Sequence, residues 1–237
     1  MRKIVLFSIL TLSFFACQNK ETKTGNVHLR GNIAGLSQGK LYLQKLQDTA
    51  FVTIDSVLFK GNSNFDCYFN IESPEVIYLS LDRGQTQSID NNLPIFVEPG
   101  EITLNTKLKE FFSAAEIKGS KNQDLWEAFK KSNSNFTNAN LDIIQKRLEN
   151  ELNYNAAKQD SIDNAYKKLL RKKYLFVTNF AITNANYEIA PYLALTEIPD
   201  INVAFLDSIA NKMPPKVASS KYGKMLNEHI KDIKKNQ

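Results

Sequence analysis

The sequence has few of the residues on which many enzymes and small secreted domains depend. It contains only two cysteines and two histidines in 237 residues. Cys17 and Cys67 cannot form a Cys-x-x-Cys redox pair or the disulfide framework of a small secreted domain. His28 and His229 lie near opposite ends of the chain, and no His-Glu-x-x-His pattern occurs, which argues against a zinc site. We therefore expect no metal and no other cofactor.

The motifs of common enzyme classes are also missing. No Gly-x-Ser-x-Gly sequence marks a nucleophile elbow, although a Ser-His-Asp relay assembled in space stays open. The stretch 35–40, Gly-Leu-Ser-Gln-Gly-Lys, is one residue short of a phosphate loop and leads into a predicted strand, so it indicates a hairpin turn.

Acidic residues near the predicted turns are the remaining catalytic candidates. They are Asp55, Asp66, Asp82, Asp90, Glu98 and Glu101. Two of them could flank a glycosidic bond, but acids at turns commonly serve solvation and local hydrogen bonds. We expect no enzyme, and keep a hydrolase that uses turn carboxylates as an alternative.

The only long apolar run lies at the N-terminus and is too short to cross a membrane. Ile4–Phe15 holds about a dozen residues, whereas a spanning helix needs about 20. Two basic residues precede it and Ala16-Cys17 closes it, which predicts a signal peptide over residues 1–16. The segment resembles a bacterial lipobox, with Phe14 in place of the usual Leu, Val or Ile. The resemblance implies a diacylglyceryl thioether on Cys17 and an acyl group, such as palmitate, on its amine.

A lipid at this position places the rest of the chain in the cell envelope, outside the cytoplasm. Residues 17–26 are polar and predict a lipidated tether. Gln18 stands where an aspartate would favour retention in the inner membrane, so we expect the outer membrane, on either the periplasmic side or the surface. Two or three acyl chains make such an anchor effectively permanent. Export also argues against nucleic acid as a partner.

Residues 27–119 show the period-two pattern of strands, interrupted by Gly, Asn and Pro turns. The predicted strands are Val27–Leu29, Lys40–Leu46, Phe51–Phe59, Asn64–Ile71, Val76–Asp82, Leu93–Val97, Ile102–Thr106 and Ala115–Lys118. Such spacing without helices predicts an antiparallel β-sandwich or open barrel. Cys67 lies in the alternating stretch Phe65–Phe69, on the same side of the predicted strand as these two phenylalanines, which predicts a buried thiol.

Residues 120–237 change to the period of helices, so the chain as a whole belongs to the α+β class, with an all-α helical C-terminal region. Leu141, Ile144, Leu148 and Leu152 recur every three or four residues and predict one apolar helix face. Asp200 is a candidate cap for a later helix, and Pro191 should kink or shorten another.

The second half also carries the surplus of positive charge, with 18 basic and 13 acidic side chains from Gly119 onwards. A basic cluster covers one broad face of a predicted helix: Lys167, Lys168, Arg171 and Lys172. The cluster predicts contact with an anionic surface, such as lipid headgroups or an acidic partner. A plain solvated helix face is the alternative.

Several short motifs occur together in a recognisable order. They are Gly31-Asn32-Ile33, Gly39-Lys40-Leu41-Tyr42-Leu43, Ile54-Asp55-Ser56-Val57, the run from Ile95 to Leu104, and Ile117-Lys118-Gly119-Ser120 ahead of Trp126-Glu127-Ala128-Phe129. This order resembles the uncharacterised β-rich N-terminal domain of Gram-negative lipoproteins that continue into a thioredoxin-like, AhpC/TSA-type domain. The likeness spans about residues 27–130, and the stretch up to Ile233 is similar to the helical spacer of those proteins.

The chain departs from those proteins where the thioredoxin-like domain would begin, and it lacks the Cys-x-x-Cys of that domain. The resemblance thus implies an accessory module without the enzyme. We expect a membrane-anchored, non-enzymatic binding or scaffold lipoprotein. The alternative is a partner or regulator of a separate thioredoxin-like thiol-disulfide oxidoreductase in the envelope.

Overall fold

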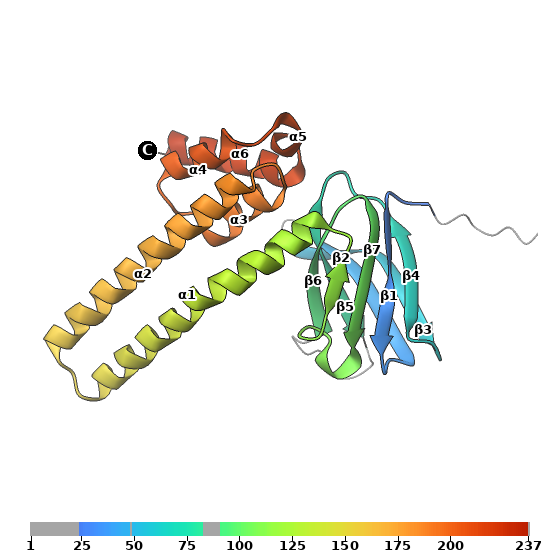
Figure 1. Cartoon of the computed structure of the whole chain (residues 1–237), viewed down its shortest axis with the longest axis horizontal. Coiled ribbons are helices and arrows are strands. Elements are labelled where there is room, and N and C mark those ends of the chain that lie inside the picture. The colour runs from blue at the N-terminus through green and yellow to red at the C-terminus, as the bar shows by residue number, and fades with distance from the viewer. Residues whose placement is uncertain (1–23, 48, 83–90, 237) are drawn as a thin grey trace, which may run out of the picture.

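The computed structural model describes residues 24–47, 49–82 and 91–236. Strands occupy the N-terminal part of these ranges and helices follow (Figure 1). The predicted α+β class, a β-sandwich followed by a helical region, is confirmed. The signal peptide, Cys17 and the tether as far as residue 23 lie outside the described residues, as does Asp90, so the lipid anchor stays a prediction.

The described strands form two four-stranded sheets that face each other. The first sheet has the order β4 (Asn64–Phe69), β1 (Val27–Ala34), β7 (Gly100–Lys107) and β8 (Glu116–Lys118). The second has the order β3 (Ala50–Lys60), β2 (Gln38–Gln47), β5 (Glu75–Asp82) and β6 (Asn92–Val97). The strand pairs are antiparallel except for β1 and β7, which run parallel. A parallel pair needs a long connection, and the five strands between β1 and β7 supply one.

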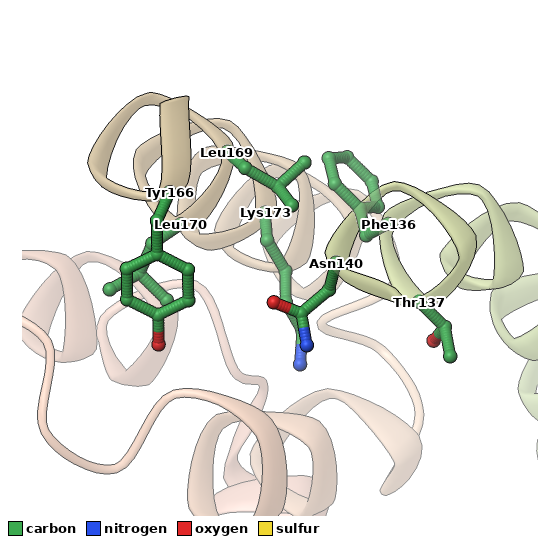
Figure 2. Close-up of a pocket in the computed structure, with 7 residues that line it drawn as sticks. All are labelled: Phe136, Thr137, Asn140, Tyr166, Leu169, Leu170 and Lys173. Atoms are coloured by element: carbon green, nitrogen blue, oxygen red, sulfur yellow. The ribbon is translucent and has the colours of Figure 1, made fainter. Parts of the chain in front are cut away.

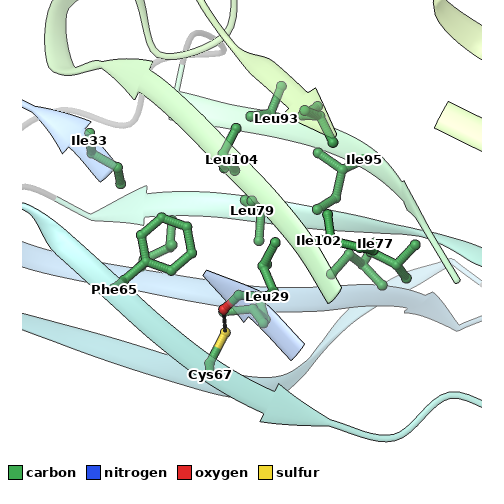
Figure 3. Close-up of a cluster of buried hydrophobic side chains, with 14 of the residues drawn as sticks. Leu29, Ile33, Phe65, Cys67, Ile77, Leu79, Leu93, Ile95, Ile102 and Leu104 are labelled. Atoms are coloured by element: carbon green, nitrogen blue, oxygen red, sulfur yellow. Dashed lines mark hydrogen bonds between the residues drawn. The ribbon is translucent and has the colours of Figure 1, made fainter. Parts of the chain in front are cut away.

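The core of the sandwich comes from the inward side of each strand, as period-two alternation dictates. Leu29, Leu79 and Leu104 are fully buried between the sheets (Figure 3). The prediction that Cys67 is buried is confirmed, and its thiol donates a hydrogen bond of 3.3 Å to the carbonyl oxygen of Leu29.

Two long helices form a hairpin that projects from the sandwich, with the connection between them at the far end (Figure 1). α1 (Lys121–Leu152) starts at Ser120, whose hydroxyl accepts a hydrogen bond from the Gln123 amide. α2 (Ala156–Thr183) starts at Asn155, whose side chain accepts one from the Lys158 amide. Both residues are favourable N-caps because their side chains satisfy amides that have no partner within the helix.

Four shorter helices lie beside the C-terminal end of α2. They are α3 (Ile189–Glu197), α4 (Val203–Ala210), α5 (Pro215–Ala218) and α6 (Lys221–Lys235). Their buried side chains form a second core with α2, the start of α1, and Val76 and Phe96 from the second sheet.

The start of α4 differs from the prediction, whereas the effect of Pro191 on α3 agrees with it. Asp200 does not cap a helix, because α4 begins later and the Asn202 side chain accepts the hydrogen bond of the Ala204 amide at 3.0 Å. Pro191 does shorten its helix. It lies in the first turn of α3, where backbone N–H groups have no acceptor within the helix. The missing N–H of proline therefore removes no helical hydrogen bond there.

Candidate interaction surfaces

The base of the helical hairpin is joined to the sandwich by polar contacts. Glu98, directly after β6, accepts hydrogen bonds from the Lys121 amide at 2.8 Å and from Asn122 Nδ2 at 2.9 Å. The Phe96 amide donates to Gln123 Oε1 at 2.8 Å. A carboxylate at the positive end of the α1 dipole is favourable. These contacts fix the direction in which the hairpin leaves the sheet.

Aromatic side chains fill the junction between the sheet and the helices. Phe96 makes edge contacts with Trp126, Tyr192 and Tyr222 at centroid distances of 6.3, 5.6 and 5.9 Å. The hydroxyl of Tyr222 accepts a hydrogen bond of 3.0 Å from the Val76 amide. Burial raises the pKa of both Tyr192 and Tyr222, so both stay protonated at neutral pH. The junction between the sheet and the helices is therefore a packed part of the protein core.

The contact between α1 and α2 is aromatic near the base and polar toward the tip. Near the base, Phe176 lies 5.6 Å from Phe129 and 5.3 Å from Phe136, centroid to centroid. Nearer the tip, Arg147 pairs with Asp163 at 3.2 Å. A polar helix contact contributes less apolar burial than an aliphatic one, so the outer half of the hairpin depends more on hydrogen bonds.

A small cavity of about 200 Å³ lies along this contact (Figure 2). It is lined by Phe136, Thr137, Asn140, Tyr166, Leu169, Leu170 and Lys173. Small-molecule sites usually measure about 300–1,000 Å³, so this cavity is small for a substrate. Lys173 is the one cation of the lining, and its ammonium is paired with Glu197 at 2.9 Å.

The four predicted basic residues lie together on α2. Lys167, Lys168, Arg171 and Lys172 are all exposed, and we call them the basic face. Among the described residues, none of the four has an ion-pair partner. At 3.6 residues per turn they lie on the side of α2 opposite the buried Ile162 and Val177. The structure thus exposes the basic face, and contact with an anionic surface stays a prediction.

The apolar face predicted on α1 is exposed. Leu141, Ile144, Leu148 and Leu152 have 57%, 41%, 58% and 83% of their surface accessible. We call these four residues the apolar stripe. Other side chains of α1 are covered, since Phe136 packs against Phe176 of α2 and Ile143 is buried. The periodicity shows that the stripe shares one side of the helix, but not what covers it.

The outer face of the first sheet is polar. A hollow of about 500 Å³ there is lined by Arg30, Gly31, Asn32, Asn62, Asn64, Phe65, Asp66, Thr103 and Asn105. Beside it His28 contacts two acids, with Nε2 at 3.0 Å from Asp66 Oδ2 and Nδ1 at 3.9 Å from Glu101 Oε2. The His28 ring also stacks on Tyr68 at 4.1 Å.

The turn carboxylates proposed as catalysts are placed in different surroundings. Asp66 and Glu101 both contact His28, whereas Glu98 caps α1 and Asp55 accepts a hydrogen bond from the Ser56 amide. His229 has a different partner, since its Nε2 donates a hydrogen bond to the carbonyl oxygen of Pro199 at 2.8 Å. Hydrolysis by a pair of acids stays a hypothesis.

None of the helices in the described ranges combines the length and the apolar character needed to cross a membrane. No group of three or more His, Cys, Asp or Glu side chains in the same ranges is arranged to hold a metal ion.

Residues 27–126 match a family described as a domain of unknown function (DUF4369). The match covers the sandwich and the first residues of α1. It confirms that the N-terminal part is a domain of unknown function, whereas the lipoprotein context and the relation to thioredoxin-like proteins stay predictions. No curated protein matches the chain.

Sequence reasoning missed the polar arrangement on the first sheet. His28, Asp66 and Glu101 come from three strands, and their contact depends on the β4-β1-β7 order. The available signal was alternation, since His28, Arg30 and Asn32 are outward positions of β1. The predicted strand, Val27–Leu29, ends before Arg30 and Asn32, so it includes only His28 of these three. Alternation assigns residues to one face of the sheet, but strand order decides which residues on that face are neighbours.

Proposed function

We propose that the protein is a lipid-anchored scaffold of the bacterial cell envelope, which binds a partner protein through the projecting hairpin. The apolar stripe is the observation that carries this proposal. Four large side chains on one side of a helix remain exposed at 41% or more. Contiguous exposed apolar surface is disfavoured in water and commonly marks an interaction site.

The charges around the apolar stripe favour a basic helical partner. Asp142 and Glu149 lie on one flank of the stripe, and Glu151 lies on the other. Stripe residues spaced by three and four positions match the seam of a helix pair. A partner helix with Lys or Arg beside its apolar residues would complement both features.

The same charges disfavour two other occupants. An antiparallel pair of copies that sets Leu141 against Leu152 also sets Asp142 against Glu151, and like charges opposed in this way cost free energy. Anionic headgroups would meet the same acids. A second copy or a lipid surface therefore fits the stripe less well than a basic protein helix.

The experiment is site-specific photo-cross-linking in the bacterial envelope with the full-length protein. A photoreactive residue at Leu148 should give one protein adduct, and the cross-linked segment should be an amphipathic helix with basic flanks. Leu175 on α2 is the matched control, because it is also an exposed helical leucine, at 42%, but lies outside the stripe. We expect no such adduct there.

Three outcomes would overturn the scaffold proposal: no protein adduct at Leu148, adducts equal at Leu148 and Leu175, or cross-linking only to lipid or to a second copy. A thioredoxin-like protein in the adduct would identify the accessory role as the specific form of the function. The anchor is tested separately, because Cys17→Ser should move the protein from the membrane fraction to the aqueous fraction. An unmodified N-terminus in the native protein would contradict the anchor.

A further inference from the structure

The outer face of the first sheet carries a regular array of polar side chains. Strand register sets them in three rows across β4, β1 and β7, which we call the polar grid. The rows are Tyr68, His28 and Glu101, then Asp66, Arg30 and Thr103, then Asn64, Asn32 and Asn105. The second and third rows line the hollow of about 500 Å³, a volume in the usual range for small ligands.

The charged side chains of the polar grid already have partners within it. Arg30 forms an ion pair with Glu101 at 2.5 Å, and the Asp66 carboxylate is hydrogen-bonded to His28 Nε2 at 3.0 Å. An anionic ligand would compete with Glu101 for Arg30, and a cationic ligand would compete with Arg30 for Glu101. The pairing therefore favours a neutral ligand.

The amides of the third row indicate the polar groups of that ligand. Asn32 Nδ2 donates to Asn64 Oδ1 at 2.7 Å and to Ser63 Oγ at 3.0 Å, so the row is held in position. Asn105 lines the hollow and makes no side-chain hydrogen bond with any residue that the structure describes. An amide offers both donors and an acceptor, and a hydroxyl group likewise donates and accepts. A row of amides thus matches a ligand rich in hydroxyl groups.

We propose that the polar grid is a binding site for a neutral saccharide. The asparagines, Thr103, Arg30 and Asp66 would share hydrogen bonds with adjacent ring hydroxyls. The hollow is open to solvent, so affinity for one saccharide unit is weak and a surface bearing many copies is held by multivalent contact. This site lies on the sandwich and is independent of the apolar stripe.

The test is nuclear magnetic resonance titration of the full-length protein in a detergent without sugar groups. The probes are neutral trisaccharides of glucose, mannose and N-acetylglucosamine. At least one should saturate the protein and shift the side-chain amide signals of Asn32 and Asn105. Asn105→Ala should weaken binding by about tenfold, the scale of one or two lost hydrogen bonds.

Matched variants separate binding from folding. Asn138→Ala removes an exposed asparagine from α1 and should leave saccharide binding unchanged. Asn105→Asp keeps the side-chain shape but replaces the amide donors, so it should also weaken binding. Saturation by none of the probes, or equal binding by wild type and both Asn105 variants, would overturn the saccharide site. Leu148→Ser should retain binding, which separates this test from that of the scaffold.

Discussion

At the residue scale, Gly119 occupies a position that no other residue fits. It joins β8 to the N-cap of α1 with φ of +99°, and a Cβ there would lie 2.1 Å from the carbonyl oxygen of Glu101. Gly61 is a matched control, because its φ is +80° but no atom lies within 4 Å of its added Cβ. Gly61→Ala should cost about 1–2 kcal/mol of unfolding free energy, and Gly119→Ala more than about 3 kcal/mol.

Urea unfolding of the two variants measures this difference. Equal costs would show that β8 can move away from β7 without loss. Such a result would mean that the approach of Gly119 to the backbone of Glu101 does not fix the start of the hairpin.

Two buried tyrosines predict how stability depends on pH. Burial raises the pKa of Tyr192 and Tyr222 in the folded state above the ordinary value of 10.0. The unfolded chain therefore loses these protons first, so their stabilisation is complete below about pH 10 and is lost as pH rises above it. Tyr192→Phe should make the decline in unfolding free energy between pH 9 and pH 11 shallower. The slope should decrease by about 1.4 kcal/mol per pH unit for each proton that the unfolded chain no longer loses. Urea unfolding at each pH measures this slope.

The control for this prediction is Tyr154→Phe, because Tyr154 is 71% exposed. It should leave the pH profile as in the wild type. Identical slopes for the wild type and Tyr192→Phe would show that this phenol does not contribute to alkaline destabilisation.

Some of these residue contacts could be predicted from the sequence and others could not. Burial of Cys67 follows from alternation within one short strand, which is local information. The hydrogen bond from Val76 to Tyr222 joins positions 146 residues apart, and that from Ile189 to Asn122 joins positions 67 apart. Contacts of that length depend on how whole elements pack, which periodicity within one element does not specify.

At the scale of elements, the periodicity of apolar residues predicted every described strand, but the residue types at the start of α4 suggested the wrong N-cap. Asp200 and Asn202 are both acceptable caps by residue type, and the structure uses Asn202 for α4. The apolar stripe shows a second limit. Its spacing correctly predicts a shared helix side, yet α1 packs Phe136 against α2 and buries Ile143 instead. Which side of an amphipathic helix is covered depends on the partner.

The basic face of α2 predicts electrostatic attraction to anionic membranes. The experiment uses the Cys17→Ser protein, so that acyl chains do not mask the contribution of the helix. Each cation near an anionic surface contributes about 1 kcal/mol, so replacing Lys167, Lys168, Arg171 and Lys172 with glutamine should weaken partition into phosphatidylglycerol vesicles by at least about tenfold. Vesicle sedimentation at low and at physiological salt measures the partition, which should fall with salt.

A control variant keeps the same net charge change at other sites. Lys212, Lys216, Lys224 and Lys231 are exposed lysines away from α2, and their replacement with glutamine should have a smaller effect. Equal losses for the two variants would attribute binding to net charge alone. Binding to zwitterionic vesicles as strong as to anionic ones would contradict an electrostatic contact.

At the scale of the whole molecule, the sandwich and the helices share a core. Val76 and Phe96 belong to the second sheet, yet both are buried among helical side chains. Glu75 also forms an ion pair with Lys221 at the start of α6, and Ser73 accepts a hydrogen bond from the Lys221 amide at 3.0 Å. The two parts of the chain should therefore unfold together, although their sequence patterns differ.

Phe96→Ala tests this coupling, because Phe96 is fully buried and touches three aromatic residues from three helices. Loss of such a side chain should cost about 3–5 kcal/mol. Trp126 is the only tryptophan and contacts Phe96, so its fluorescence reports on the junction, whereas far-ultraviolet circular dichroism reports mainly on the helices. In the wild type the two urea transitions should coincide, and in Phe96→Ala both should move to lower urea by the same amount.

Phe51→Ala is the control, since Phe51 is 55% exposed on β3 and should shift both transitions far less. Two separate transitions in the wild type would mean that the sheet and the helices unfold independently. In that case the hairpin could swing relative to the sandwich, and a partner bound on the apolar stripe would not be held at a fixed orientation to the polar grid. Coincident transitions instead imply that the junction orients the stripe and the grid relative to each other, as a scaffold requires.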